Sequence, residues 1–65
     1  MIRVNGEPIE ADNISVAQFL KDNGYRVGTI VVECNEVIVR KEQYEQHILH
    51  DGDVVEILNF VGGGW

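Results

Sequence analysis

The sequence predicts an α+β fold in which a mixed sheet of about five strands packs on one helix. Apolar and polar residues alternate in several short segments, as they do in half-buried strands. A single segment, near the start of the chain, has helical spacing and capping residues instead. At 65 residues the chain is expected to form one domain, because so small a protein cannot bury enough surface for two cores.

The opening segment, MIRVNGEPIEA, is expected to form a β-hairpin. Ile2 and Val4 alternate with a charged residue, and Asn5-Gly6 is the dipeptide that two-residue turns favour. Pro8 has no backbone N–H to donate, so the second strand is expected at an edge of the sheet.

The next segment, NISVAQFLKDNG, is expected to be the helix. Ser15 can cap the first turn, Gln18 lies three residues later as in a capping box, and Gly24 suits the left-handed position that ends a helix. The buried stripe is expected to contain Val16, Phe19, Leu20 and Ile14.

The second half of the chain is rich in β-branched residues and predicts strands at Thr29–Glu33, Val37–Val39 and Val54–Val61. Between them, KEQYEQHIL is too short for an independent helix and is expected to form one turn with Tyr44 packed inward. The resulting order fits the β-grasp, or ubiquitin-like, arrangement. Its first and last strands are expected to lie side by side in the centre, in parallel.

The last strand is expected to place Val55 and Ile57 in the core, because its side chains alternate between the two faces. Leu58 and Phe60 then lie on the open face, and together with Val61 they are predicted to bind a partner protein. The alternative is that Phe60 covers the edge of the core.

The composition argues against several classes of protein. The net charge of -6 would repel nucleic acid and anionic membrane surfaces, so neither is an expected partner. One cysteine cannot form an internal disulfide, and no apolar run approaches the length of a membrane span. The expected location is the cytoplasm.

Catalytic and metal sites are not expected in this chain. Cys34 is interpreted as a passive residue at a strand end rather than a reactive thiol. His47 and His50 lack the further Cys or His that a zinc site needs, so no metal is expected. There is no glycine-rich loop opening a helix, so no phosphate-bearing cofactor is expected to be bound.

The segments VNGEPIE, IVVECNEVIVRKEQYEQHIL, DGDVVEI and FVGGG, in this order, resemble the ThiS/MoaD family of ubiquitin-like sulfur carrier proteins, and within it the ThiS group of thiamine biosynthesis. The resemblance covers the chain to Gly64. It implies that the Gly64 carboxylate is adenylated with ATP by a ThiF-like enzyme and becomes a thiocarboxylate. That group would give its sulfur to thiazole synthase, with a cysteine desulfurase as a source. The chain itself would then be a co-substrate, not an enzyme.

The C-terminal glycines suit that role physically. Residues 1–61 are expected to form the β-grasp domain and 62–65 a flexible tail. Gly62 and Gly63 have no Cβ, so they can thread a tunnel too narrow for side chains. Extended at roughly 3.3 to 3.6 Å per residue, the segment from Val61 to Gly64 reaches on the order of 13 Å.

Trp65 departs from the family pattern, because a tunnel fitted to glycine should exclude an indole. Three explanations stay open: a protease cleaves the Gly64–Trp65 bond, the tryptophan is an artificial addition or variant, or carrier activity has been lost. The rival functions are accordingly a non-carrier β-grasp module that binds a partner through its sheet, or a sulfur carrier for molybdopterin or cysteine synthesis.

Overall fold

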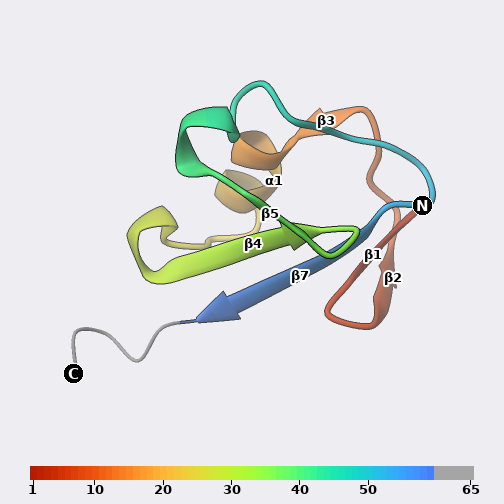
Figure 1. Ribbon diagram of the computed structural model, residues 1–65. Coiled ribbons are helices and arrows are strands. Elements are labelled where there is room, and N and C mark those ends of the chain that lie inside the picture. The colour runs from red at the N-terminus through yellow and green to blue at the C-terminus, as the bar shows by residue number, and fades with distance from the viewer. Residues whose placement is uncertain (60–65) are drawn as a thin grey trace.

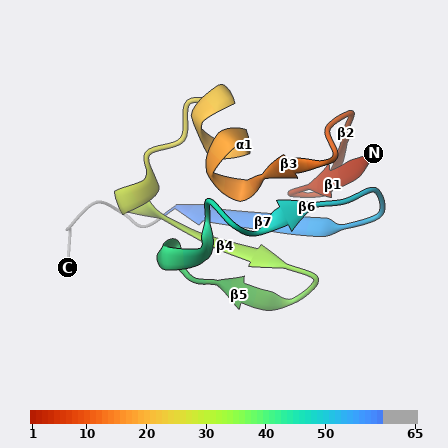
Figure 2. The same cartoon turned by 90° about the horizontal axis from the view of Figure 1, so that it is seen from above.

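The computed structural model of the protein describes residues 1–59 (Figure 1). Within these residues, five strands form one sheet in the order β2-β1-β7-β4-β5. The strands are β1 (Ile2–Val4), β2 (Glu7–Ile9), β4 (Ile30–Cys34), β5 (Val37–Val39) and β7 (Val54–Asn59). The helix α1 (Val16–Asp22) lies against one face of this sheet, and no helix of the described residues covers the other (Figures 1 and 2).

The pairing of β7 confirms the β-grasp prediction. β7 lies in the centre of the sheet, parallel to β1 and antiparallel to β4. Val4 of β1 is aligned with Val55, and Val32 of β4 is opposite Ile57. β2 is an edge strand, as expected from Pro8.

Three short elements complete the fold. The 3-10 turn η1 (Val27–Thr29) includes Thr29, which was predicted to begin the next strand. The Thr29 backbone N–H and hydroxyl both donate to the Arg26 carbonyl, at 3.0 and 2.9 Å, so β4 starts one residue later than predicted. It also ends one residue later, at Cys34. The turn η2 (Lys41–Gln43) is the expected single turn. The pair β3 (Ile14–Ser15) and β6 (Ile48–Leu49) was not predicted, because two-residue strands carry no readable alternation.

The two ends of α1 have the capping expected, with one correction. The Ser15 hydroxyl accepts the Gln18 backbone N–H at 3.0 Å. The Gln18 side chain does not complete a capping box; it donates to Asp22 one turn ahead, at 2.7 Å, a spacing that favours side-chain pairs on a helix surface. At the other end, Gly24 has a φ of 76° and the Tyr25 N–H donates to the Leu20 carbonyl, which forms a Schellman motif.

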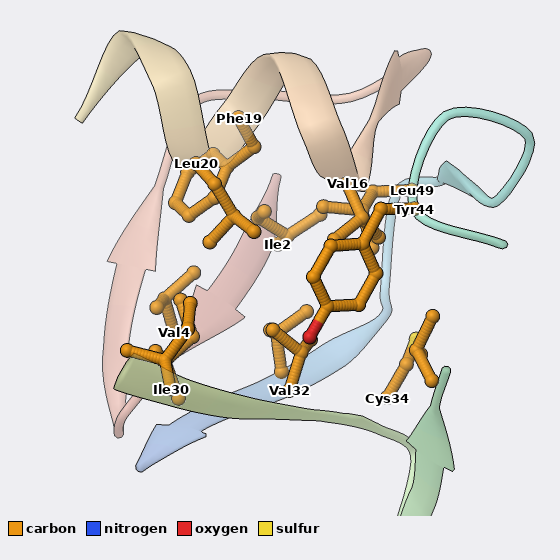
Figure 3. Packing of buried hydrophobic residues seen from close by; sticks show 13 residues of the cluster. Ile2, Val4, Val16, Phe19, Leu20, Ile30, Val32, Cys34, Tyr44 and Leu49 are labelled. Carbon is orange, nitrogen blue, oxygen red and sulfur yellow. The ribbon is translucent and has the colours of Figure 1, made fainter. Parts of the chain in front are cut away.

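The core fills the space between α1 and the sheet (Figure 3). Phe19 and Leu20 point from the helix toward the sheet strands, and Tyr44 closes one side, as predicted. Ile14 is only partly buried and packs on the edge of this cluster. The buried residues of the described chain are Ile2, Val4, Val16, Phe19, Leu20, Ile30, Val32, Cys34, Val39, Tyr44, Leu49, Val55 and Ile57.

The turn between β1 and β2 is bonded to β7. Asn5 and Gly6 have φ values of 51° and 85°, the left-handed conformation of the predicted two-residue turn. The Asn5 backbone N–H donates to the Val55 carbonyl at 2.9 Å. Its side-chain amide donates to the Ile57 carbonyl at 3.3 Å and accepts the Ile57 N–H at 2.8 Å. The Asn5 side chain therefore continues the β1–β7 pairing beyond the last residue of β1.

The turn between β4 and β5 bonds the other side of β7. Asn35, also left-handed with a φ of 53°, donates its backbone N–H to the Val54 carbonyl at 2.7 Å. Its side-chain oxygen accepts the Val54 N–H at 2.9 Å, and its side-chain nitrogen donates to Asp53 at 3.1 Å. One asparagine from each hairpin thus holds the strand that leads to the C-terminus.

We expect Asn5→Gly to lower the free energy of unfolding by about 1–3 kcal/mol. The change removes two part-buried hydrogen bonds between the Asn5 side chain and the backbone of Ile57, and each such bond typically contributes about 0.5–1.5 kcal/mol. Glycine keeps the left-handed turn, so the loss reports the side-chain amide. Urea denaturation measures it.

The matched control for that change is Asn13→Gly. Asn13 has a φ of 55°, and its side chain makes no hydrogen bond within residues 1–59. Both variants gain the same backbone freedom in the unfolded chain. Equal effects of the two substitutions would show that the Asn5 amide contributes nothing.

Candidate functional site

Of the predicted site residues, the structure describes one, near the C-terminal end of β7. Leu58 is described by the structure. Phe60, Val61, Gly62, Gly63, Gly64 and Trp65 lie outside the described residues, as does the predicted boundary between domain and tail. The last described residue, Asn59 of β7, lies opposite Ile30 at the start of β4.

Leu58 faces away from the core, as predicted. It is 50% exposed, whereas its neighbours Val55 and Ile57 are buried against α1. The alternation follows from the pleat of β7, which points successive side chains to opposite faces. The corresponding prediction for Phe60 lies outside the described residues.

Leu58 belongs to a larger surface, which we name the open face. It is the side of the sheet opposite α1. On β4, β5 and β7 it is formed by Val31, Glu33, Ile38, Val54, Glu56 and Leu58. Arg3 of β1, aligned with Val54, and Pro8 of β2 lie on the same side. Leu58 lies opposite Val31 across the β4–β7 pairing, and Ile38 and Val54 are 61% and 47% exposed. Exposed apolar side chains gathered on one face are typical of a protein-binding surface.

The centre of the open face is acidic. Glu33 of β4 lies directly opposite Glu56 of β7, and Ile38 of β5 is the other neighbour of Glu33. Two like charges directly across a strand pair destabilise the sheet. These glutamates are far apart in the sequence, and only the strand register brings them together. No local pattern in the sequence indicates that they meet.

Cys34 lies at the end of β4 beside Asp53. Burial raises the pKa of the Cys34 thiol, and the negative charge of Asp53 and a hydrogen bond to it raise that pKa further. A thiol kept neutral is a poor nucleophile, so the burial of Cys34 favours the passive role, which stays a prediction.

Asp53 acts as a capping group before β7. Its carboxylate accepts the His50 backbone N–H at 2.9 Å and the Asn35 amide at 3.1 Å. Burial by itself would raise the pKa of Asp53, but these hydrogen bonds outweigh it and the pKa is lowered. The carboxylate is therefore ionised and holds the turn that starts β7.

Within residues 1–59, no three His, Cys, Asp or Glu side chains are grouped so that they could hold a metal ion. In the same residues no helix has the length and apolar character needed to cross a membrane.

Known proteins are similar to this chain in sequence and in fold. The family model described as ThiS family matches residues 2–64. A protein named sulfur carrier protein ThiS, from Bacillus subtilis, is 35% identical over 98% of this chain and 100% of its own length. A thiazole synthase from Magnetococcus marinus is 31% identical over 97% of this chain, which corresponds to 20% of that protein.

A solved structure agrees with the sequence relatives. The crystal structure of the thiamine biosynthesis protein (ThiS) from Geobacter metallireducens superimposes with a TM-score of 0.81 at 31% identity. The match covers 97% of each chain. With the family model spanning nearly the whole sequence and a relative matched over its full length, this chain belongs to the ThiS family.

Proposed function

We propose that this chain is a sulfur carrier protein of thiazole formation in thiamine biosynthesis, and a stoichiometric co-substrate rather than an enzyme. The observation that carries the proposal is the family match over residues 2–64. Its last residue, Gly64, is the one predicted to be adenylated and converted to a thiocarboxylate. The full-length similarity to a protein named as a sulfur carrier supports it.

The reacting group is the Gly64 carboxylate. A carboxylate is a poor acyl donor because its oxygen is a poor leaving group. When the partner enzyme adenylates this group, a carboxylate oxygen bonds to the α-phosphate of ATP and pyrophosphate is released, so that AMP becomes a good leaving group. A sulfur nucleophile then displaces AMP from the acyl carbon, which leads to the thiocarboxylate. The chain contributes a slender terminus, since Gly62 and Gly63 have no side chains to exclude it from a tunnel.

The open face is the proposed docking surface for a ThiF-like adenylating enzyme. Leu58 and Val31 offer apolar contact area next to the predicted tail, and Phe60 and Val61 are proposed to extend it. Glu33 and Glu56 favour a partner with basic residues facing this surface, because opposite charges steer association and remove the repulsion between the two glutamates.

The similarity to part of a thiazole synthase supports that enzyme as the recipient of the sulfur. In that relative, a stretch similar to this chain belongs to the same polypeptide as the named enzyme, which suits two functions that meet repeatedly. A cysteine desulfurase is the proposed sulfur source. The proposed location of these steps is the cytoplasm, where ATP is abundant.

Trp65 is proposed to be removed before charging. It lies beyond the residues that the family model matches, and its side chain is the largest of any amino acid. Cleavage of the Gly64–Trp65 bond would expose the glycine carboxylate. The second candidate function is a binding module that uses only the open face, and the presence of Trp65 after the glycines is the observation that favours it.

We expect the chain ending at Gly64, but not the 65-residue chain, to gain the mass of one sulfur-for-oxygen exchange when incubated with a ThiF-like enzyme, ATP, a persulfide donor and a thiol that reduces the acyl disulfide first formed. Intact-protein mass spectrometry measures the change. The control omits ATP. A folded chain ending at Gly64 that is never charged would exclude the carrier function and leave the binding module.

We expect Glu56→Gln to make the protein more stable and to make it a poorer substrate for adenylation. Removing one of two facing carboxylates should raise the free energy of unfolding by about 0.2–1 kcal/mol. The same change should raise the KM of the adenylating enzyme for the chain ending at Gly64, because the enzyme's basic residues lose one of the two carboxylates with which they are proposed to pair. Urea denaturation and steady-state adenylation kinetics give the two values.

Glu45→Gln is the control, since Glu45 is exposed and lies outside the open face. It should leave both quantities nearly unchanged. If Glu45→Gln raises the KM as much as Glu56→Gln does, the effect comes from net charge and not from a docking surface.

A further inference from the structure

A groove of about 320 Å³ lies at the free edge of the sheet, beside β5 and η2. The buried residues Ile30, Val39 and Tyr44 contribute to its lining, and the exposed side chain of Ile38 borders it. Arg40 and Lys41 line the same groove, together with Glu42. A volume of this size is at the lower end of the range for small-molecule sites and is sufficient for one aromatic side chain.

The groove exists because β5 is shorter than its neighbour. β5 ends at Val39, opposite Val32, whereas β4 begins two residues earlier, at Ile30. After Val39 the chain leaves the sheet and enters η2. The first residues of β4 are therefore left without a strand partner on this side, and apolar side chains border the resulting notch.

The charges at this groove differ from those of the molecule as a whole. Arg40 and Lys41 are two of only five basic residues in a chain with a net charge of -6. Another groove of similar volume is lined by Met1, Glu10, Ala11 and Asp12, so its side-chain charges are negative. A smaller one is lined by Gln43, Gln46 and His47. Of these three, the groove at β5 is the one that suits an apolar group next to a negative charge.

The C-terminal segment of the chain begins within reach of the groove. β7 ends at Asn59, opposite Ile30, which is itself part of the groove lining. Neighbouring strands lie about 4.8 Å apart, so the groove is roughly one to two strand spacings from the end of β7. Residues 60–65, extended, span on the order of 20 Å.

We propose that the groove binds the indole of Trp65 of the same chain, an inhibitory contact that withholds the Gly64 segment from its activating enzyme. Indole is the best aromatic partner for an arginine side chain. Arg40 and Lys41 line the groove and offer a charge opposite to that of the carboxylate that Trp65 carries in the 65-residue chain. This inference rests on the proposed function of Gly64, since only a working carrier has a terminus to withhold.

Docking would also compete with the partner enzyme directly. Ile38 belongs both to the open face and to the groove, so a docked enzyme and a bound Trp65 would contact the same side chain and could not bind together. Ordering residues 60–65 costs conformational entropy, most of all at the three glycines, which makes the contact readily reversible. Removing Trp65 would abolish it.

Tryptophan fluorescence tests this directly, because Trp65 is the only tryptophan in the chain. In the 65-residue protein we expect emission at shorter wavelength and weaker quenching by acrylamide than in the Ile38→Ser variant. Adding salt should shift the wild-type emission toward that of the variant, since part of the contact is between charges. Circular dichroism checks that both proteins are folded.

Val37→Ser is the matched control. Val37 and Ile38 are adjacent in β5 and similarly exposed, at 66% and 61%, but only Ile38 lines the groove. Val37→Ser should keep the wild-type emission. The inference is overturned if the wild-type emission equals that of Ile38→Ser, or if Val37→Ser changes it equally.

A second measurement follows the removal of Trp65 by a carboxypeptidase. If the tail is docked nine-tenths of the time, trimming of the wild-type protein is about tenfold slower than that of Ile38→Ser. Equal rates would overturn the inference. Neither readout uses the adenylating enzyme. If both readouts show no docking of Trp65 while the chain ending at Gly64 is still converted to its thiocarboxylate, only the groove contact is rejected. If the readouts show that Trp65 is docked but the chain ending at Gly64 is never converted to a thiocarboxylate, the carrier function is rejected instead.

Discussion

The parallel pairing of β1 with β7 is the constraint on which the rest of this structure depends. It joins the first strand of the chain to the last one described, and every other element lies between them in sequence. β1 is too short to pair with the whole of β7. The amide of Asn5 supplies the missing hydrogen bonds, so a turn residue acts as part of the sheet.

Holding β7 in the centre of the sheet has a functional consequence. Asn5 bonds it from the β1 side and Asn35 from the β4 side, so the last described strand is bonded on both sides. Its last described residue, Asn59, therefore lies at a defined point of the domain. That arrangement suits a protein whose proposed reactive group is at its terminus, because a partner can locate the terminus by binding the domain.

The proposed docking role of the open face would have a cost in the stability of the free chain. A sheet designed only for stability would place opposite charges, or an apolar pair, where Glu33 faces Glu56. Instead the two glutamates face each other, with apolar side chains around them on the open face. A basic partner would relieve their repulsion, so the unfavourable term in the free protein becomes a favourable term in a complex. The acidic pair therefore gives the surface a preference for one class of partner.

The sequence by itself determined much of this protein. Local patterns gave the hairpin at Asn5-Gly6, the cap at Ser15, the left-handed Gly24 and the burial of Val55, because each depends on residues close together in the chain. The motifs ending at Gly64 indicated the family. What only the tertiary structure decided are relations across the sheet: the Asn5 amide on β7, the facing glutamates, the β3–β6 pair and the groove at β5. Strand register and strand ends set these, and they follow from packing of the whole domain rather than from any single segment.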